Sequence, residues 1–189
     1  MALRRAFKEK YLMVSMRRLV MALVISTGLL AGVGCGADYI RDDQIYKDDI
    51  DFRIDDDSQI EDTLENREVL DVLASYRKAV VTKDFGTLKR LISPNYYDNA
   101  GTTNTTEDDY SASDLAEVFE MMAQGAREIR YDVLVRDVKV KGERATVDYK
   151  FDYAYKYVIA DESSWDAGVD VNRLELERED GVWRIVSGL

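Results

Sequence analysis

The chain has 189 residues, of which 46% are apolar, and a formal net charge of −11. This composition supports one folded domain with short appendages and excludes a wholly disordered protein. The acidic excess lies after residue 34, because residues 1–34 carry six Lys or Arg and one Glu. An acidic surface without a basic stripe repels phosphate backbones, so we expect no nucleic-acid partner.

The chain has one cysteine, Cys35, and no histidine. A single thiol forms no internal disulfide, and zinc sites of the usual Cys/His kind are excluded. Histidine triads and histidine general bases are excluded as well. The acidic residues 36–57 lack the ordered aspartate spacing and central glycine of an EF-hand loop. We therefore expect no metal and no cofactor.

The N-terminal segment is typical of an export signal. Arg17 and Arg18 precede an apolar run over residues 19–33. This run is short for a bilayer span, which needs about 20 residues, and small residues follow it. Those small residues directly before Cys35 resemble the lipobox of bacterial lipoproteins. The resemblance implies that residues 1–34 are a cleaved signal peptide and that Cys35 is the diacylated mature N-terminus.

Two alternatives remain for this segment, a plain secretory signal and an uncleaved anchor. Gly32 stands where lipoproteins prefer leucine, and Met16 would begin a more typical signal than Met1. Gly36 follows the cysteine where inner-membrane retention in enteric bacteria would place aspartate, which favours the outer membrane. We expect a cell-envelope location with the domain facing the periplasm.

Residues 35–57 are predicted to be an acidic tether. Nine aspartates and three basic residues lie between positions 36 and 57, and like-charge repulsion favours an extended segment. Ile50, Phe52 and Ile54 alternate with charged residues, which is typical of a half-buried strand. A short edge strand or docked arm is therefore the alternative for this part.

Three helices are predicted next. The first begins near residues 58–62, where two capping-box spacings occur. Asp84 caps a short second helix that ends before Pro94, and Ser111 opens a third helix with Asp114. The apolar face of the first helix consists of Val69, Val72, Leu73, Tyr76 and Val80.

After Gly125 the apolar period changes to two, which predicts β-strands. A one-residue slip at Arg136 and Asp137 is typical of a β-bulge, and Gly142 marks a hairpin turn. The following strand is aromatic on one side and should line the concave face of a bent sheet. That side consists of Ala145, Val147, Tyr149, Phe151, Tyr153, Tyr155, Tyr157 and Ile159.

The last part of the chain is predicted to form a loop and two strands. Residues 161–168 are interpreted as a long hairpin loop, with Trp165 exposed or folded back over the sheet edge. A strand over residues 169–179 contains a second register slip, and a final hairpin turns at Asp180 and Gly181.

This order of elements resembles the NTF2-like superfamily over residues 58–189. The resemblance implies an α+β cone, in which three N-terminal helices pack on a strongly bent, mostly antiparallel sheet. The fold hosts enzymes, binding modules and scaffolds alike. The residues that carry the resemblance are Tyr76, Ala79, Lys83, Asp84, Leu88, Leu91, the segment SPNYYD (93–98) and the ending DGVWRIVSG (180–188).

Resemblance to the ketosteroid-isomerase-like and SnoaL-like branches implies a catalytic trio. Asp98 would be the base, while Tyr76 and a neutral Asp170 would stabilise the enolate. The alternative interpretation is structural: Tyr76 is a core aromatic residue, Asp98 a turn residue and Asp170 a surface charge.

The aromatic strand also has two interpretations. Tyr149, Phe151, Tyr153 and Tyr155 could line a pocket for an apolar small molecule. They could instead fill the cone or form a homodimer face.

We therefore expect an exported protein, attached to the membrane through lipidated Cys35, with a non-catalytic ligand-binding or accessory module. The first alternative is a small isomerase or cyclase that uses the trio. The second is a scaffold that forms a homodimer through its sheet.

Overall fold

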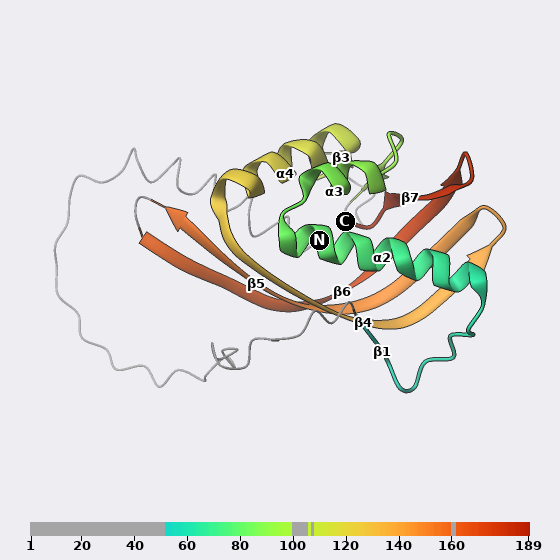
Figure 1. The fold of residues 1–189 in the computed structure, drawn as a ribbon. Helices are drawn as coiled ribbons and strands as arrows, with labels where there is room; N and C mark the ends of the chain where they lie inside the picture. The colour runs from blue at the N-terminus through green and yellow to red at the C-terminus, as the bar shows by residue number, and fades with distance from the viewer. Residues whose placement is uncertain (1–51, 100–105, 107, 160–161) are drawn as a thin grey trace. The chain divides into compact units, whose positions relative to one another are not determined.

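The computed structural model describes residues 52–99, 106, 108–159 and 162–189. The predicted signal peptide, Cys35 and the tether up to residue 51 lie outside the described residues. Within them, no helix is long and apolar enough to cross a membrane. Figure 1 shows the described helices stacked against one curved sheet.

Helix α2 (Leu64–Thr82) is the longest described helix, and its cap lies one residue after Asp62, the later of the two predicted caps. Its cap is Thr63, whose side chain accepts a hydrogen bond from the N–H of Asn66 at 3.1 Å. The capping spacing at Asp62 is not used, because the Asp62 carboxylate binds Arg67 at 2.5 Å instead.

The other two helices begin where the sequence predicts. Helix α3 (Phe85–Leu91) starts after Asp84, whose carboxylate accepts the N–H of Thr87 at 2.9 Å. Helix α4 (Ala112–Gly125) has the predicted capping box of Ser111 and Asp114.

The described part contains seven strands: β1 (Arg53–Ile54), β2 (Tyr97–Asp98), β3 (Tyr110–Ser111), β4 (Ala126–Lys141), β5 (Arg144–Ile159), β6 (Glu162–Glu179) and β7 (Val182–Ser187). Five of them form one sheet in the order β1-β4-β5-β6-β7, and β2 pairs with β3 separately. Only the β1–β4 pair of this sheet is parallel. The mostly antiparallel α+β architecture of the prediction is therefore confirmed.

The bulge predicted at Arg136 is present. The register between β4 and β5 shifts between Val135 and Asp137, which leaves Arg136 without a cross-strand partner on β5. Such an extra residue bends its strand and increases the local twist, in keeping with the curvature of the sheet.

Strand β6 differs from the prediction in two ways. The expected loop around Trp165 is strand, because β6 pairs continuously with β5 from Glu162 to Glu177. The expected slip after Val171 is absent: Val169 and Val171 are 60% and 59% exposed, whereas Leu174 lies on the buried face. An apolar pair on the solvent face produced the apparent slip.

The end of the predicted tether also forms a strand. Arg53 and Ile54 pair with Leu134 and Val135 of β4, and the Arg53 guanidinium binds the Asp132 carboxylate at 3.1 Å. For these two residues the edge-strand alternative is correct, and the extended tether is not.

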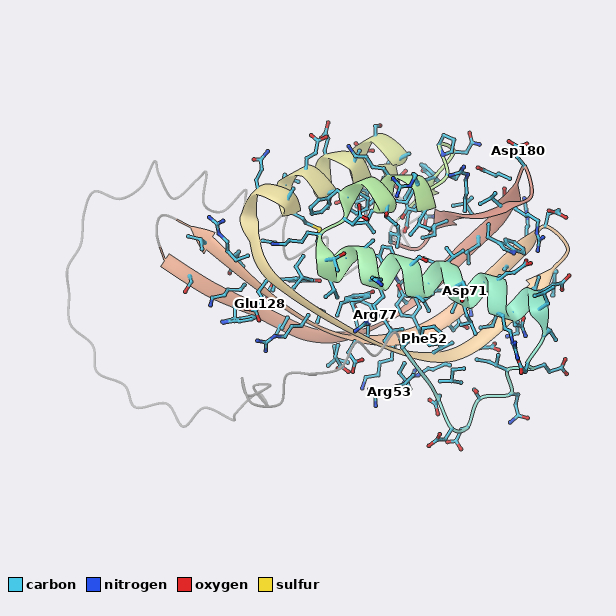
Figure 2. All side chains as sticks on the ribbon, in the orientation of Figure 1. Phe52, Arg53, Asp71, Arg77, Glu128 and Asp180 are labelled. Atoms are coloured by element: carbon cyan, nitrogen blue, oxygen red, sulfur yellow. The ribbon has the colours of Figure 1, made fainter. Side chains whose placement is uncertain are left out.

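Helix α2 lies across the concave face of the sheet (Figure 1). Its buried side chains are Val69, Leu70, Leu73, Tyr76, Ala79 and Val80. Arg77 extends from α2 toward β4, where its Nε donates a hydrogen bond to the carbonyl oxygen of Tyr131 at 3.0 Å (Figure 2). This packing encloses the concave face, where the candidate catalytic and pocket residues were expected.

Candidate functional site

Tyr76 lies on the buried face of α2 and is 6% exposed. Its ring meets Tyr131 of β4 edge to face, with the ring centroids 6.1 Å apart. This is a favourable geometry for an aromatic pair inside a core. Tyr76 therefore joins the helix to the sheet.

Asp98, the candidate base, binds the end of the chain. Its carboxylate accepts hydrogen bonds from the N–H of Gly188 at 3.0 Å and from the Tyr96 hydroxyl at 3.2 Å. The Tyr96 hydroxyl in turn accepts the N–H of Leu189 at 3.0 Å. These bonds hold the C-terminal residues against β2.

Asp170, the candidate neutral acid, lies opposite Phe151 in the β5–β6 register. Its carboxylate accepts the N–H of Val171 at 2.8 Å, an amide at the exposed side of β6. Each member of the trio thus has a structural contact of its own, and their convergence on one substrate stays a prediction. Among the described residues, no group of three or more Asp, Glu, Cys or His is placed to hold a metal ion.

The row of aromatic residues on β5 is buried and closely packed. Tyr149, Phe151, Tyr153 and Tyr155 are between 1% and 8% exposed. Successive ring centroids lie 5.8, 6.0 and 5.1 Å apart, and the Tyr153 and Tyr155 rings are stacked. The rings pack against one another as core side chains do.

A polar cluster lies among these buried rings and consists of the Tyr131 and Tyr149 hydroxyls and the Asn172 amide. The Tyr131 and Tyr149 hydroxyl oxygens are 3.5 Å apart, and the Asn172 amide donates to the Tyr149 hydroxyl at 3.3 Å. The Tyr155 hydroxyl is buried without a hydrogen-bond partner among the described residues. A buried donor without a partner is unfavourable, so this hydroxyl is a candidate contact for a ligand.

Burial determines the protonation of these phenols. It raises the pKa of Tyr131 and of Tyr155 well above the ordinary value, and neighbouring phenols raise both further. Burial also raises the pKa of Tyr149, although hydrogen bonds from Tyr131 and Asn172 act in the opposite direction. All three remain neutral hydrogen-bond donors near pH 7, as an oxyanion-binding group must.

Sequence reasoning did not single out Tyr131 and Asn172 as members of this cluster. Tyr131 lies between Ile129 and Val133 in the apolar alternation of its strand. That pattern indicates a core position but does not indicate a polar role. The role of Asn172 could have been predicted from its position two residues before Leu174. Alternate residues of a strand share a face, so the Asn172 amide lies on the buried face of β6.

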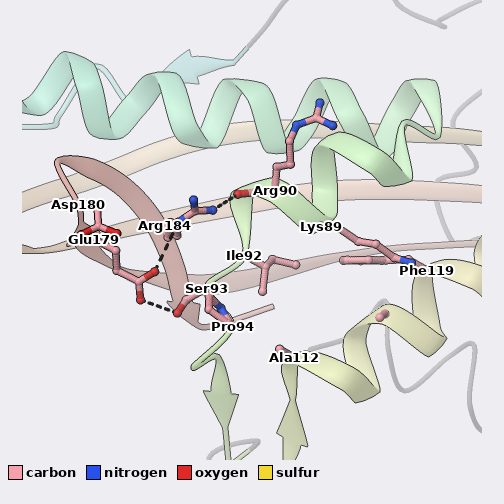
Figure 3. A pocket seen from close by; sticks show the side chains of 11 residues that line it. Lys89, Arg90, Ile92, Ser93, Pro94, Ala112, Phe119, Glu179, Asp180 and Arg184 are labelled. Atoms are coloured by element: carbon pink, nitrogen blue, oxygen red, sulfur yellow. Dashed lines mark hydrogen bonds and ion pairs between the residues drawn. The ribbon is translucent and has the colours of Figure 1, made fainter.

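A groove of about 530 Å³ lies among α3, α4 and the β6–β7 turn (Figure 3). No residue of α2 lines it. Its apolar residues are Ile92, Pro94, Ala112, Ala116 and Phe119. Its charged residues are Lys89, Arg90, Glu179, Asp180 and Arg184.

A hydrogen-bond network around the buried Ser93 fixes one wall of this groove. Ser93 is fully buried, and its hydroxyl donates to the Glu179 carboxylate at 2.6 Å. Arg184 binds the second oxygen of that carboxylate at 3.4 Å and donates to the carbonyl oxygen of Arg90 at 2.5 Å (Figure 3). The wall therefore connects the Ser-Pro turn, the end of α3 and the last hairpin.

A second pocket of about 450 Å³ lies where β4, β5 and β6 bend. Tyr149 and Asn172 line it, so the polar pair of the phenol cluster also borders a surface pocket. Beside them, Arg173 binds the Asp148 carboxylate through two nitrogens at 2.6 and 2.8 Å. This ion pair holds the Asp148 pKa below its ordinary value, chiefly through its hydrogen bond.

Comparison with known proteins gives a family match and a set of structural neighbours. Residues 69–188 match the family of the SnoaL-like domain. No protein with curated annotation matches the chain.

Three solved structures show the same fold at low sequence identity. The first is an NTF2-like family protein from Streptomyces avermitilis, provisionally named a dehydratase, with a TM-score of 0.53 and 16% identity over 65% of this chain and 91% of that one. The second, a ketosteroid isomerase-like protein from Erwinia carotovora atroseptica, has a TM-score of 0.52 and 12% identity over 67% and 94%. The third, from Novosphingobium aromaticivorans and provisionally named a scytalone dehydratase, has a TM-score of 0.53 and 12% identity over 66% and 81%.

Proposed function

The chain belongs to the SnoaL-like family, which has the NTF2-like fold, and we propose that it is a lipid-anchored cell-envelope protein. Its domain would bind a ligand without catalysing a reaction. The anchor is supported by the basic flank, the short apolar run and Cys35. The domain faces the periplasm, and Gly36 after the cysteine favours the outer membrane.

One observation carries the non-catalytic part of the proposal: the candidate carboxylates already have structural partners. Asp98 binds Gly188 and Tyr96, and Asp170 binds the amide of Val171. A base must be within hydrogen-bond reach of the proton that it removes. A carboxylate that holds the chain terminus in place is poorly available for that role.

The groove beside α3 and α4 is the binding surface that we assign to the domain. A ligand in the cone would have to displace stacked rings, whereas the groove offers apolar side chains and charges of both signs. An apolar segment with a charged end fits this arrangement, since pockets combine apolar walls with a few polar groups that orient the ligand.

Anilinonaphthalene sulfonate, an apolar anion, probes this surface. Its fluorescence should rise with the wild-type protein and fall back with Ala116→Glu, which introduces a like charge into the groove. Ala123→Glu is the matched control, because it makes the same substitution at an exposed position of α4 outside the groove lining. Equal loss in both variants would exclude the groove as the probe site.

Lipidation is tested in bacteria that express the full chain and are fed an alkyne-labelled fatty acid. We expect label on the wild-type protein and none on Cys35→Ala, which should also leave the membrane fraction. Label retained by Cys35→Ala would contradict lipidation at that residue.

An isomerase is the second candidate, because the Tyr155 hydroxyl has no hydrogen-bond partner among the described residues. It lies among neutral phenols, and neutral hydrogen-bond donors are what an enolate intermediate requires. The purified domain can be incubated with 5-androstene-3,17-dione while the absorbance of the conjugated enone is followed. We expect no turnover above the rate without protein. Turnover that Asp98→Asn abolishes would establish the isomerase instead.

A further inference from the structure

Among the residues that the structure describes, the outer edge of β6 has no strand partner over much of its length. Strand β7 pairs with β6 only between Glu175 and Glu179. No other described strand pairs with the outer side of residues 162–172, which we call the free edge. A long unpaired strand edge is a template for pairing with another chain.

Two hydrogen bonds show which residues of β6 direct their backbone groups outward. The N–H of Val171 is bound by the Asp170 side chain, and the N–H of Arg173 by the Asn172 side chain at 2.9 Å. These amides are therefore not used by β5. Because backbone groups alternate along an antiparallel strand, Ser163, Trp165, Ala167 and Val169 also direct theirs outward.

We propose that two copies of this chain pair through their free edges, antiparallel and about a two-fold axis at Ala167. Ala167 is the midpoint of residues 162–172, so this register pairs the whole free edge with its counterpart. A two-fold interface requires a surface that is complementary to itself. In this register the numbers of two opposite residues add up to 334, which is twice 167, so Ser163 of one copy lies opposite Val171 of the other.

The convex-face residues match in this register. Trp165 of one copy lies opposite Val169 of the other, and Ala167 lies opposite Ala167. Trp165 and Val169 are 37% and 60% exposed in the single chain, and an aromatic residue opposite a β-branched one is a favourable cross-strand pair. Trp165 is also held in place, since the Arg130 guanidinium lies 4.7 Å from its ring centroid.

The concave-face residues match as well. Asp166 lies opposite Gly168, and Asp170 lies opposite Ser164, so no two carboxylates face each other. An axis at Asp166 would oppose the two copies of Asp166, and an axis at Gly168 would oppose Asp166 with Asp170. Like charges directly opposite are destabilising, so both neighbouring registers are disfavoured. Moving the axis by two residues avoids this repulsion but leaves part of each free edge unpaired.

Pairing also reassigns the contact of Asp170. The N–H of Val171, now bound by Asp170, would donate to the carbonyl oxygen of Ser163 in the second copy. The Asp170 carboxylate would then be released toward the opposite Ser164 hydroxyl. In the single chain, Asp170 therefore covers an amide that the second copy would use. This pairing is independent of what the groove binds.

Cysteine cross-linking of the full chain in membranes tests the register. Ala167→Cys should form a disulfide-linked dimer on mild oxidation, because opposite residues of an antiparallel pair have Cα atoms about 4.5–5.5 Å apart, within disulfide range. Val169→Cys is the matched control, since it is exposed but lies about 13 Å from its own copy, four strand positions away. The double variant Trp165→Cys/Val169→Cys should cross-link again. The wild-type chain reveals any dimer formed through Cys35.

Charge substitution at the axis supplies a test that needs no oxidation. Ala167→Asp and Ala167→Lys should each sediment as single chains in detergent, whereas an equal mixture should sediment as pairs. Unchanged circular dichroism shows that the exposed substitutions leave the fold intact. Cross-linking of Val169→Cys as fast as Ala167→Cys, or single chains for the wild type, would overturn the proposal.

Discussion

The carboxylate of Asp98 accepts a hydrogen bond from the backbone N–H of Gly188, which lies 3.0 Å away and 90 residues later in the chain. This bond joins the short strand β2 to the residues that follow β7. A residue that resemblance assigns to proton transfer thus has an observed role in closing the fold, and the two roles predict different mutant phenotypes.

Asp98→Ala should lower the free energy of unfolding by about 1–3 kcal/mol, because it leaves a backbone amide and the Tyr96 hydroxyl without this acceptor. Asp170→Ala is the control and should change stability by less than about 0.5 kcal/mol, since the bound amide faces solvent. Urea titration measures both. Equal stability of the two variants would contradict the structural role of Asp98.

Gly188→Ala should be strongly destabilising, by about 3 kcal/mol or more. Gly188 has a φ of +94°, and a Cβ there would overlap the carbonyl oxygen of Arg173. Gly142→Ala separates backbone strain from this overlap, because Gly142 has a φ of +60° and nothing within 4 Å of an added Cβ. It should cost about 1–2 kcal/mol. Similar thermal unfolding of both variants would show that the overlap relaxes.

Tyr155→Phe should leave stability unchanged or raise it by about 1 kcal/mol, because it removes a buried hydroxyl that has no partner in the described part of the chain. Tyr149→Phe should instead lower stability by about 1 kcal/mol, since it removes the acceptor of the Asn172 amide. Urea titration of the pair tests this difference in sign. A clear loss of stability in Tyr155→Phe would mean that its hydroxyl has a partner in solution.

Alkaline pH should unfold the domain cooperatively. The pKa values of Tyr131, Tyr149 and Tyr155 are raised in the folded chain, chiefly by burial. Their contribution to stability is present below the unfolded phenol pKa of about 10 and is lost as the pH rises through the folded values. Phenolate absorbance should therefore rise together with the loss of circular dichroism. Ionisation of all tyrosines with unchanged circular dichroism would contradict the burial.

Much of the fold was predictable because its local signals agree with its tertiary structure. Asp84 and Ser111 are strong caps, Arg136 interrupts a clear alternation, and each is found where expected. The cap residue of α2 is harder to predict, because Thr63 and Asp62 both offer cap chemistry and only the pairing of Asp62 with Arg67 decides between them.

The parts that were mispredicted depend on partners far away in the sequence. Ser163, Ser164 and Gly168 favour a loop locally, but β5 supplies a continuous strand partner and the Tyr153 ring covers Gly168. The bond from Gly188 to Asp98 has no local signature at all. Periodicity reports which face a residue occupies, but not which distant group meets it there.

Strand β1 places the entry of the chain at one margin of the sheet, with β4 and β5 between it and β6. In the proposed dimer the two entry points would therefore lie at opposite ends of a joined sheet. Each copy would carry its own acyl anchor, so release from the bilayer would require both anchors to leave before either re-inserts. Such bivalent attachment multiplies membrane residence time without any new contact to lipid. The two-residue pairing of Arg53 and Ile54 would thereby set where the two tethers leave the joined sheet.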